Sequence, residues 1–143
     1  MKPNTHARSE IIAGITTVLR KRVLPVLLAA VWIVLSEFFR NEIFLKSYWT
    51  DHYKNLGIPF PSDPVNNAVW ILWSVCFAII VYFLSRKFSL MQTTILSWFI
   101  VFILMWIVIG NLGVLPAGLL WFAIPLSLLE TFFAAFIIKK YTG

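Results

Sequence analysis

Four long apolar stretches constrain this sequence of 143 residues more than any other feature. Each approaches the ~20 residues that a helix needs to cross the hydrocarbon core of a bilayer. A membrane β-barrel is excluded, because its strands alternate apolar and polar residues and these runs do not alternate. We therefore expect an all-α fold, an integral membrane four-helix antiparallel bundle forming one transmembrane domain. The expected spans cover about residues 23–39, 65–84, 90–109 and 117–138.

The composition excludes two other classes of protein. Hydrophobic residues make up 60% of the chain and charged residues 13%, whereas a soluble domain is near half apolar and a quarter charged. A soluble fold of this size has too small an interior for so much apolar surface. A disordered chain would carry more charge and fewer aromatic residues. The single cysteine, Cys76, allows neither an intrachain disulfide nor a cysteine-based zinc or redox motif.

The basic residues predict the orientation of the bundle. Of the twelve Lys and Arg residues, all but Arg40, Lys46 and Lys54 fall on one side of the four expected spans. Because cytoplasmic loops are enriched in Lys and Arg, we expect both termini in the cytoplasm. The net charge of +6 then indicates contact with the lipid bilayer and its anionic headgroups at the cytoplasmic face. Nucleic acid is not an expected partner, because the basic residues are spread over three separate membrane edges.

Two segments outside the spans have recognisable patterns. In the basic segment 1–22, Ser9 is placed as an N-cap before apolar residues at helical spacing, which predicts a short amphipathic helix. That helix either lies on the cytoplasmic membrane face or extends the first span. The long outer loop, 40–64, predicts a helical turn or two within 41–56 and an extended proline-rich end. Gly57 suits the C-cap of that helix.

Glu130 is the polar residue that demands most explanation. It precedes Lys139 by nine residues, which places it about 13 Å from the inner edge and close to mid-membrane. Acids at that depth face the bundle interior and tend to mark function, although a protonated, hydrogen-bonded structural Glu is an equal alternative. We expect Glu130 to face the bundle centre. We also expect it to be mostly protonated at neutral pH, since no basic residue is expected at its depth.

Glu37 and Arg40 are three residues apart and share one face of the first span. The same helical rise places them about 9 to 14 Å nearer the outside than Glu130. We therefore expect Arg40 to bond Glu37, Asn111 or the carbonyls of residues 110–115, and not Glu130. The alternative is that Glu37 and Arg40 merely clamp the outer loop at the interface.

We expect no catalytic residue, metal or cofactor. Asp51 and His52 are adjacent and point to different helix faces, so they offer no ligand pair for a metal. Neither His6 nor His52 lies in an expected span, which excludes a haem held by two histidines across the bundle. No motif of a known enzyme mechanism is present.

Three hypotheses for function remain. The first is binding or translocation of a small molecule or ion by an oligomeric bundle with a polar cavity. The second is an accessory or scaffold subunit that holds lipid or a larger membrane partner. The third is an intramembrane enzyme, which is disfavoured because acid–base catalysis needs convergent groups and only one acid lies deep in the expected bundle. In size, four-span plan and aromatic outer loop the chain resembles small bacterial membrane proteins of unassigned function, which implies the bacterial inner membrane. The expected cavity residues are Glu130, Glu37, Arg40, Asn111, Ser127 and Ser97.

Overall fold

The computed structural model describes residues 5–142, and within that range every regular element is a helix. The all-α prediction is thus confirmed for the described residues. In chain order the elements are α1 (Thr5–Val18), η1 (Leu19–Val23), α2 (Leu24–Phe38), η2 (Phe39–Phe44), α3 (Lys46–Asn55), α4 (Pro64–Ser85), α5 (Leu90–Trp98), η3 (Phe99–Ile103), α6 (Leu104–Asn111), η4 (Ala117–Leu119) and α7 (Leu120–Thr142). Of the η elements, η4 is a 3₁₀-helix and the other three are π-helical turns.

Four helical segments are long and apolar enough to cross a membrane, as predicted. They are Arg8–Phe44, Pro64–Ser85, Leu90–Asn111 and Ala117–Thr142. Each contains or closely matches one of the stretches expected from the sequence. Most of the large apolar side chains along them lie exposed on the outside of the bundle, which suits helices surrounded by lipid.

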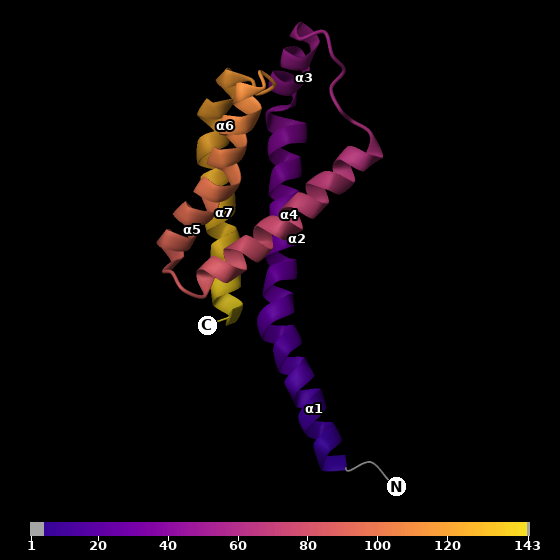
Figure 1. Ribbon diagram of the computed structural model, residues 1–143, viewed down its shortest axis with the longest axis vertical. Helices are drawn as coiled ribbons and strands as arrows, with labels where there is room; N and C mark the ends of the chain where they lie inside the picture. Colours follow the sequence, from indigo (N-terminus) through magenta and orange to yellow (C-terminus); the bar gives the residue numbers. More distant parts are fainter. Residues whose placement is uncertain (1–4, 143) are drawn as a thin grey trace.

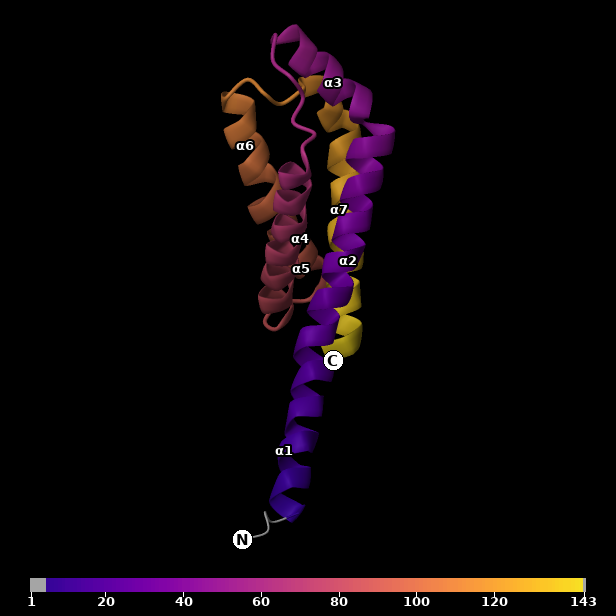
Figure 2. The same cartoon turned by 90° about the vertical axis from the view of Figure 1, so that its right-hand side faces the viewer.

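Helices α2 and α7 lie side by side and antiparallel (Figures 1 and 2). Helix α4 crosses them obliquely, and α5 with η3 and α6 forms a bent segment that packs against α7 through α5. The helices approach closely because small side chains lie between them, which is how membrane helices pack without a hydrophobic driving force. The buried alanines of α2, α4 and α7 are Ala29, Ala30, Ala78, Ala123, Ala134 and Ala135.

Helix α1 continues through η1 into α2 as one long helix and projects beyond the rest of the bundle (Figure 1). Of the two arrangements that the sequence left open for residues 1–22, the structure has the extension of the first span.

The α4–α5 turn and the end of α7 lie at the same end of the bundle as η1 (Figures 1 and 2). There Lys139 Nζ donates to the carbonyl of Ser85 at 3.0 Å. We call this end, which carries Arg20, Lys21, Arg22, Arg86, Lys87, Lys139 and Lys140, the basic end.

At the opposite end, α3 forms the helix predicted within the outer loop. His52 Nε2 lies 2.9 Å from the carbonyl oxygen of Gly113, so α3 is tied to the loop between α6 and η4. Gly113 has a φ of 73°, a left-handed conformation that glycine adopts at little cost. The C-cap of α3 is Leu56, and Gly57, which was predicted as the C-cap, follows it with a left-handed φ of 71°. We call this end the α3 end.

Candidate functional site

Glu130 lies in the interior of the bundle, as predicted, with only 1% of its surface exposed. Its Oε2 accepts hydrogen bonds from Ser36 Oγ and from Arg40 Nη1, both at 2.9 Å. Its backbone carbonyl accepts one from the indole Nε1 of Trp32 at 3.0 Å. Trp32, Ser36 and Arg40 follow one another at intervals of four residues and so share a face of the α2–η2 helix. All three residues on that face donate hydrogen bonds to Glu130 of α7.

The expectation that Arg40 does not reach Glu130 is wrong. Counting residues compares the heights of backbone atoms, whereas side chains on a helix lean toward its N-terminus. Helices α2 and α7 are antiparallel, so Arg40 leans toward the basic end while Glu130 leans toward the α3 end. Two long side chains inclined toward each other close the difference in height.

Arg40 also forms an ion pair with Glu37, as predicted. Arg40 Nη2 donates to Glu37 Oε1, and Asn41 Nδ2 donates to Glu37 Oε2 at 2.6 Å. Asn41 Oδ1 in turn accepts from Trp49 Nε1 of α3 at 3.1 Å. These bonds form an unbroken polar chain from the α3 end to the centre of the bundle. Its members are Trp49, Asn41, Glu37, Arg40, Glu130 and Ser36.

Aromatic side chains seal the polar chain on the side of α4 and η3. The Arg40 guanidinium lies over the ring of Phe102, with Cζ 5.0 Å from the centroid, which is a favourable cation–π geometry. Phe102 packs edge-on against Trp73 and Phe77, with centroids 5.6 and 5.5 Å away, and contacts Trp106. These rings exclude water from one side of the guanidinium, so its charge is balanced by the carboxyl groups and not by solvent.

Both residues of this cation–π contact lie in π-helical turns. Arg40 is the second residue of η2 and Phe102 lies within η3. A π turn inserts one extra residue into a helix and so changes the face on which the following side chains point, and such turns occur often at functional sites. The apolar pattern of the sequence gives no signal for either turn.

The charges of the polar chain do not balance. It holds two carboxyl groups, Glu37 and Glu130, and one guanidinium, Arg40, with exposed fractions of 7%, 1% and 6%. With both carboxyl groups ionised the cluster carries one net negative charge inside an apolar bundle, where uncompensated charge is costly. Glu130 Oε1 is moreover buried and has no hydrogen-bond partner. With both carboxyl groups ionised, the site is one positive charge short of neutrality.

The remaining expected cavity residues lie outside the polar chain. Ser127, one turn before Glu130, accepts from Trp98 Nε1 at 2.8 Å and donates to the carbonyl of Ile124 at 3.0 Å. Ser97 is fully buried and its Oγ has no partner. Asn111 lies exposed at the end of α6, and the structure does not bring it to Arg40 or Glu130.

Sequence reasoning missed Asn41 and Trp49 as members of the polar chain. A signal for Asn41 was present, since it follows Glu37 by four residues and so shares its helix face. Trp49 was expected only as one of the aromatic residues of the outer loop. Its bond to Asn41 depends on the non-helical residue Leu45, which separates η2 from α3 and has no clear mark in the sequence.

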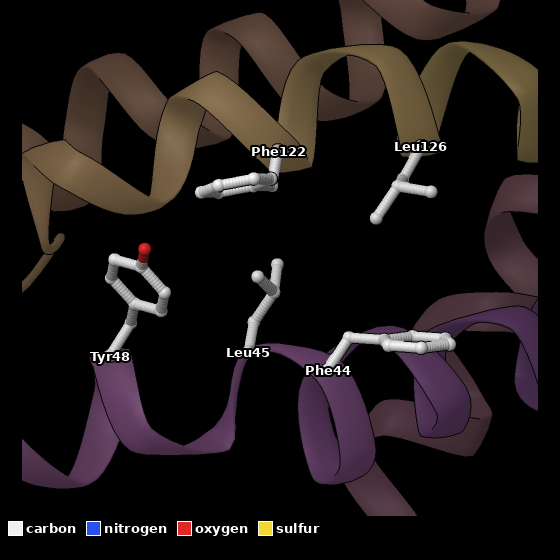
Figure 3. A pocket seen from close by; sticks show the side chains of 5 residues that line it. All are labelled: Phe44, Leu45, Tyr48, Phe122 and Leu126. Carbon is white, nitrogen blue, oxygen red and sulfur yellow. The ribbon is translucent and has the colours of Figure 1, made fainter.

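Two shallow grooves on the outside of the bundle are apolar and do not touch the polar chain. One, of about 290 Å³, lies between the start of α3 and α7 (Figure 3). It is lined by Phe44, Leu45, Tyr48, Phe122 and Leu126. The other, of about 430 Å³, follows α5 near the basic end. Within residues 5–142, no three His, Cys, Asp or Glu side chains gather in a way that could hold a metal ion.

No protein family, curated protein or solved structure matches this chain. Function is therefore inferred from the geometry and charge of the polar chain.

Proposed function

We propose that this chain is a multi-pass membrane protein that binds and translocates a small cation at the polar chain, and that this cation is a proton. The observation that carries this proposal is the buried imbalance of two carboxyl groups against one guanidinium, with one oxygen of Glu130 left without a partner. A single added positive charge makes the cluster neutral. Intramembrane acids that face the interior of a bundle are typical of ion and proton pathways.

The donor set favours a proton over a metal cation. Hard metal ions require about six oxygen ligands, and their sites are open enough to admit them. Here Glu130 Oε2 already accepts two hydrogen bonds, and Arg40, which occupies the space between the carboxyl groups, would repel a metal ion. A proton needs only one lone pair, and the unpartnered Oε1 of Glu130 offers it.

The polar chain also suggests how the proton enters. Its titrating groups are the carboxyls of Glu130 and Glu37, both bonded to Arg40, whereas Asn41 and Trp49, which do not relay a proton, join Glu37 to the α3 end. Under the predicted topology the α3 end faces away from the cytoplasm, so the site would load from outside. Protonation of Glu130 weakens its attraction to Arg40 and leaves Arg40 paired with Glu37 alone. The Arg40–Glu130 ion pair joins the α2–η2 helix to α7. Protonation of Glu130 would therefore loosen the contact between these two helices.

Reconstituted vesicles test the proposal. The wild-type chain, incorporated at known density with a pH-sensitive dye inside, is expected to dissipate a pH step faster than empty vesicles. Glu130→Gln keeps the hydrogen-bonding shape but removes the titrating group, and is expected to abolish the added flux. The control is Glu42→Gln, which removes an exposed acid paired only with Lys46. Equal flux from the wild type and Glu130→Gln would refute the proposal.

A second candidate, an accessory subunit that binds a membrane partner, is favoured by helix α1. This helix projects beyond the bundle and exposes Ile11, Ile12 and Ile15, each more than half accessible. Exposed apolar patches of this kind mark interaction sites. Ile12→Asp combined with Ile15→Asp should abolish capture of a partner in mild detergent while leaving proton flux in vesicles unchanged. Unchanged capture would remove α1 from consideration.

A further inference from the structure

The second apolar groove adjoins the basic end of the bundle. It is lined by Phe88, Met91, Gln92, Ile95 and Leu96 and has a volume of about 430 Å³. These side chains project from the start of α5 and from the turn before it. Because they recur at intervals of three and four residues, they line one outward face for about 10 Å along the helix, toward mid-membrane.

Two basic residues without an acidic partner directly precede this groove along the chain. Arg86 and Lys87 immediately precede Phe88, and both side chains are exposed. Arg86 contacts Tyr82, whose hydroxyl lies 3.5 Å from Nη1 and whose ring centroid lies 6.0 Å from Cζ. All six acidic residues of the chain lie elsewhere, at positions 10, 37, 42, 51, 63 and 130.

The neighbouring polar groups are already bonded and leave the basic side chains free to act on a ligand. Ser89 Oγ accepts from the backbone N–H of Gln92, and Gln92 Oε1 accepts from the backbone N–H of Ser89. This reciprocal capping box fixes the start of α5. Lys139 is held nearby by its bond to the carbonyl of Ser85, so a third positive charge lies one residue from Arg86.

We propose that one anionic phospholipid binds at this position, with its phosphate between Arg86 and Lys87 and one acyl chain in the groove of α5. The ligand must be anionic at one end and apolar for at least 10 Å beyond it, and it must approach from the lipid side of the bundle. An anionic phospholipid has these properties, whereas a soluble phosphate would leave the groove unused. The inference depends on membrane insertion of the bundle but not on proton binding at Glu130.

Native mass spectrometry of the full chain, released from neutral detergent, tests the site. Phosphatidylglycerol and phosphatidylcholine with the same acyl chains are added in turn. We expect retention of one phosphatidylglycerol in preference to phosphatidylcholine. In the double variant Arg86→Gln/Lys87→Gln this preference should fall by about 30-fold, since each basic residue near a bilayer contributes roughly a fivefold factor. Both residues are exposed, and circular dichroism would verify that the variant is folded.

The matched control is Lys21→Gln/Arg22→Gln, which removes two charges from the same end but lies in η1, away from the groove. It is expected to keep the preference. Equal losses in the two double variants would overturn the site and leave only a general attraction of the basic end. Glycerol phosphate carries a phosphate group but no acyl chains, so it distinguishes binding of a phospholipid from binding of a soluble phosphate. Binding of glycerol phosphate as tight as that of phosphatidylglycerol would overturn the role of the groove.

Discussion

The direct pairing of Arg40 with Glu130 makes a quantitative prediction for Arg40→Gln. Arg40 is 6% exposed and donates to both carboxyl groups, so the substitution leaves two buried acids without their cation. Breaking a buried ion pair by removing one partner costs about 3 to 5 kcal/mol of unfolding free energy. Glu130→Gln should cost only about 1 to 2 kcal/mol, because Gln still accepts from Ser36 and Arg40 stays paired with Glu37.

The double variant Arg40→Gln/Glu130→Gln isolates the pair. It leaves one buried acid instead of two, so its cost should be smaller than the sum of the single costs by about 1 to 3 kcal/mol. Unfolding free energies would be measured by reversible SDS-induced unfolding in mixed micelles, followed by tryptophan fluorescence. The control is Lys46→Gln, whose ion pair with Glu42 is 53% and 38% exposed and should contribute less than about 1 kcal/mol. Additive costs, or an Arg40→Gln cost no larger than that of Lys46→Gln, would refute the pairing.

Three further predictions concern the supports of the site and the topology. Trp32→Phe removes the indole donor to the Glu130 carbonyl and should lower the unfolding free energy by about 0.5 to 1.5 kcal/mol; an unchanged midpoint in the same SDS titration would contradict it. Gly113→Ala should destabilise by about 1 kcal/mol because its φ is 73°, whereas Gly14→Ala, in open helical surroundings, should not, as thermal melting would show. In a Cys76→Ser background, Arg86→Cys should react with an impermeant thiol reagent only from the cytoplasmic side; labelling from outside intact cells would reverse the topology.

Much of the fold followed from the sequence because hydropathy and length determine which segments can cross a membrane. The buried face of α2 was also predictable, since Ala29, Ile33 and Glu37 recur at a helical interval and all three are buried. Ser74 and Ala78 of α4 are likewise four residues apart and both buried. Helical periodicity predicts burial well where a residue's surroundings depend mainly on its own helix.

The site was predicted only in part, for physical reasons. Residue counting placed Glu37 and Arg40 on one face, but the pairing of Arg40 with Glu130 depends on how two antiparallel helices direct their side chains toward each other. The contact of Arg40 with Phe102 depends on two π-helical turns, which periodicity does not mark. The expectation that no cation lies at the depth of Glu130 was wrong, because Arg40 pairs with it directly. Asn111 was assigned by depth alone and is exposed.

The most direct test of the account is whether the buried cluster takes up and releases one proton at Glu130. Infrared difference spectroscopy of the lipid-reconstituted chain, recorded across a pH step, reports the carbonyl stretch of a protonated carboxyl group. The account predicts a band that is present in the wild type, lost in Glu130→Gln and retained in Glu42→Gln. A band that persists in Glu130→Gln, or no band in the wild type at any pH at which the protein stays folded, would contradict it.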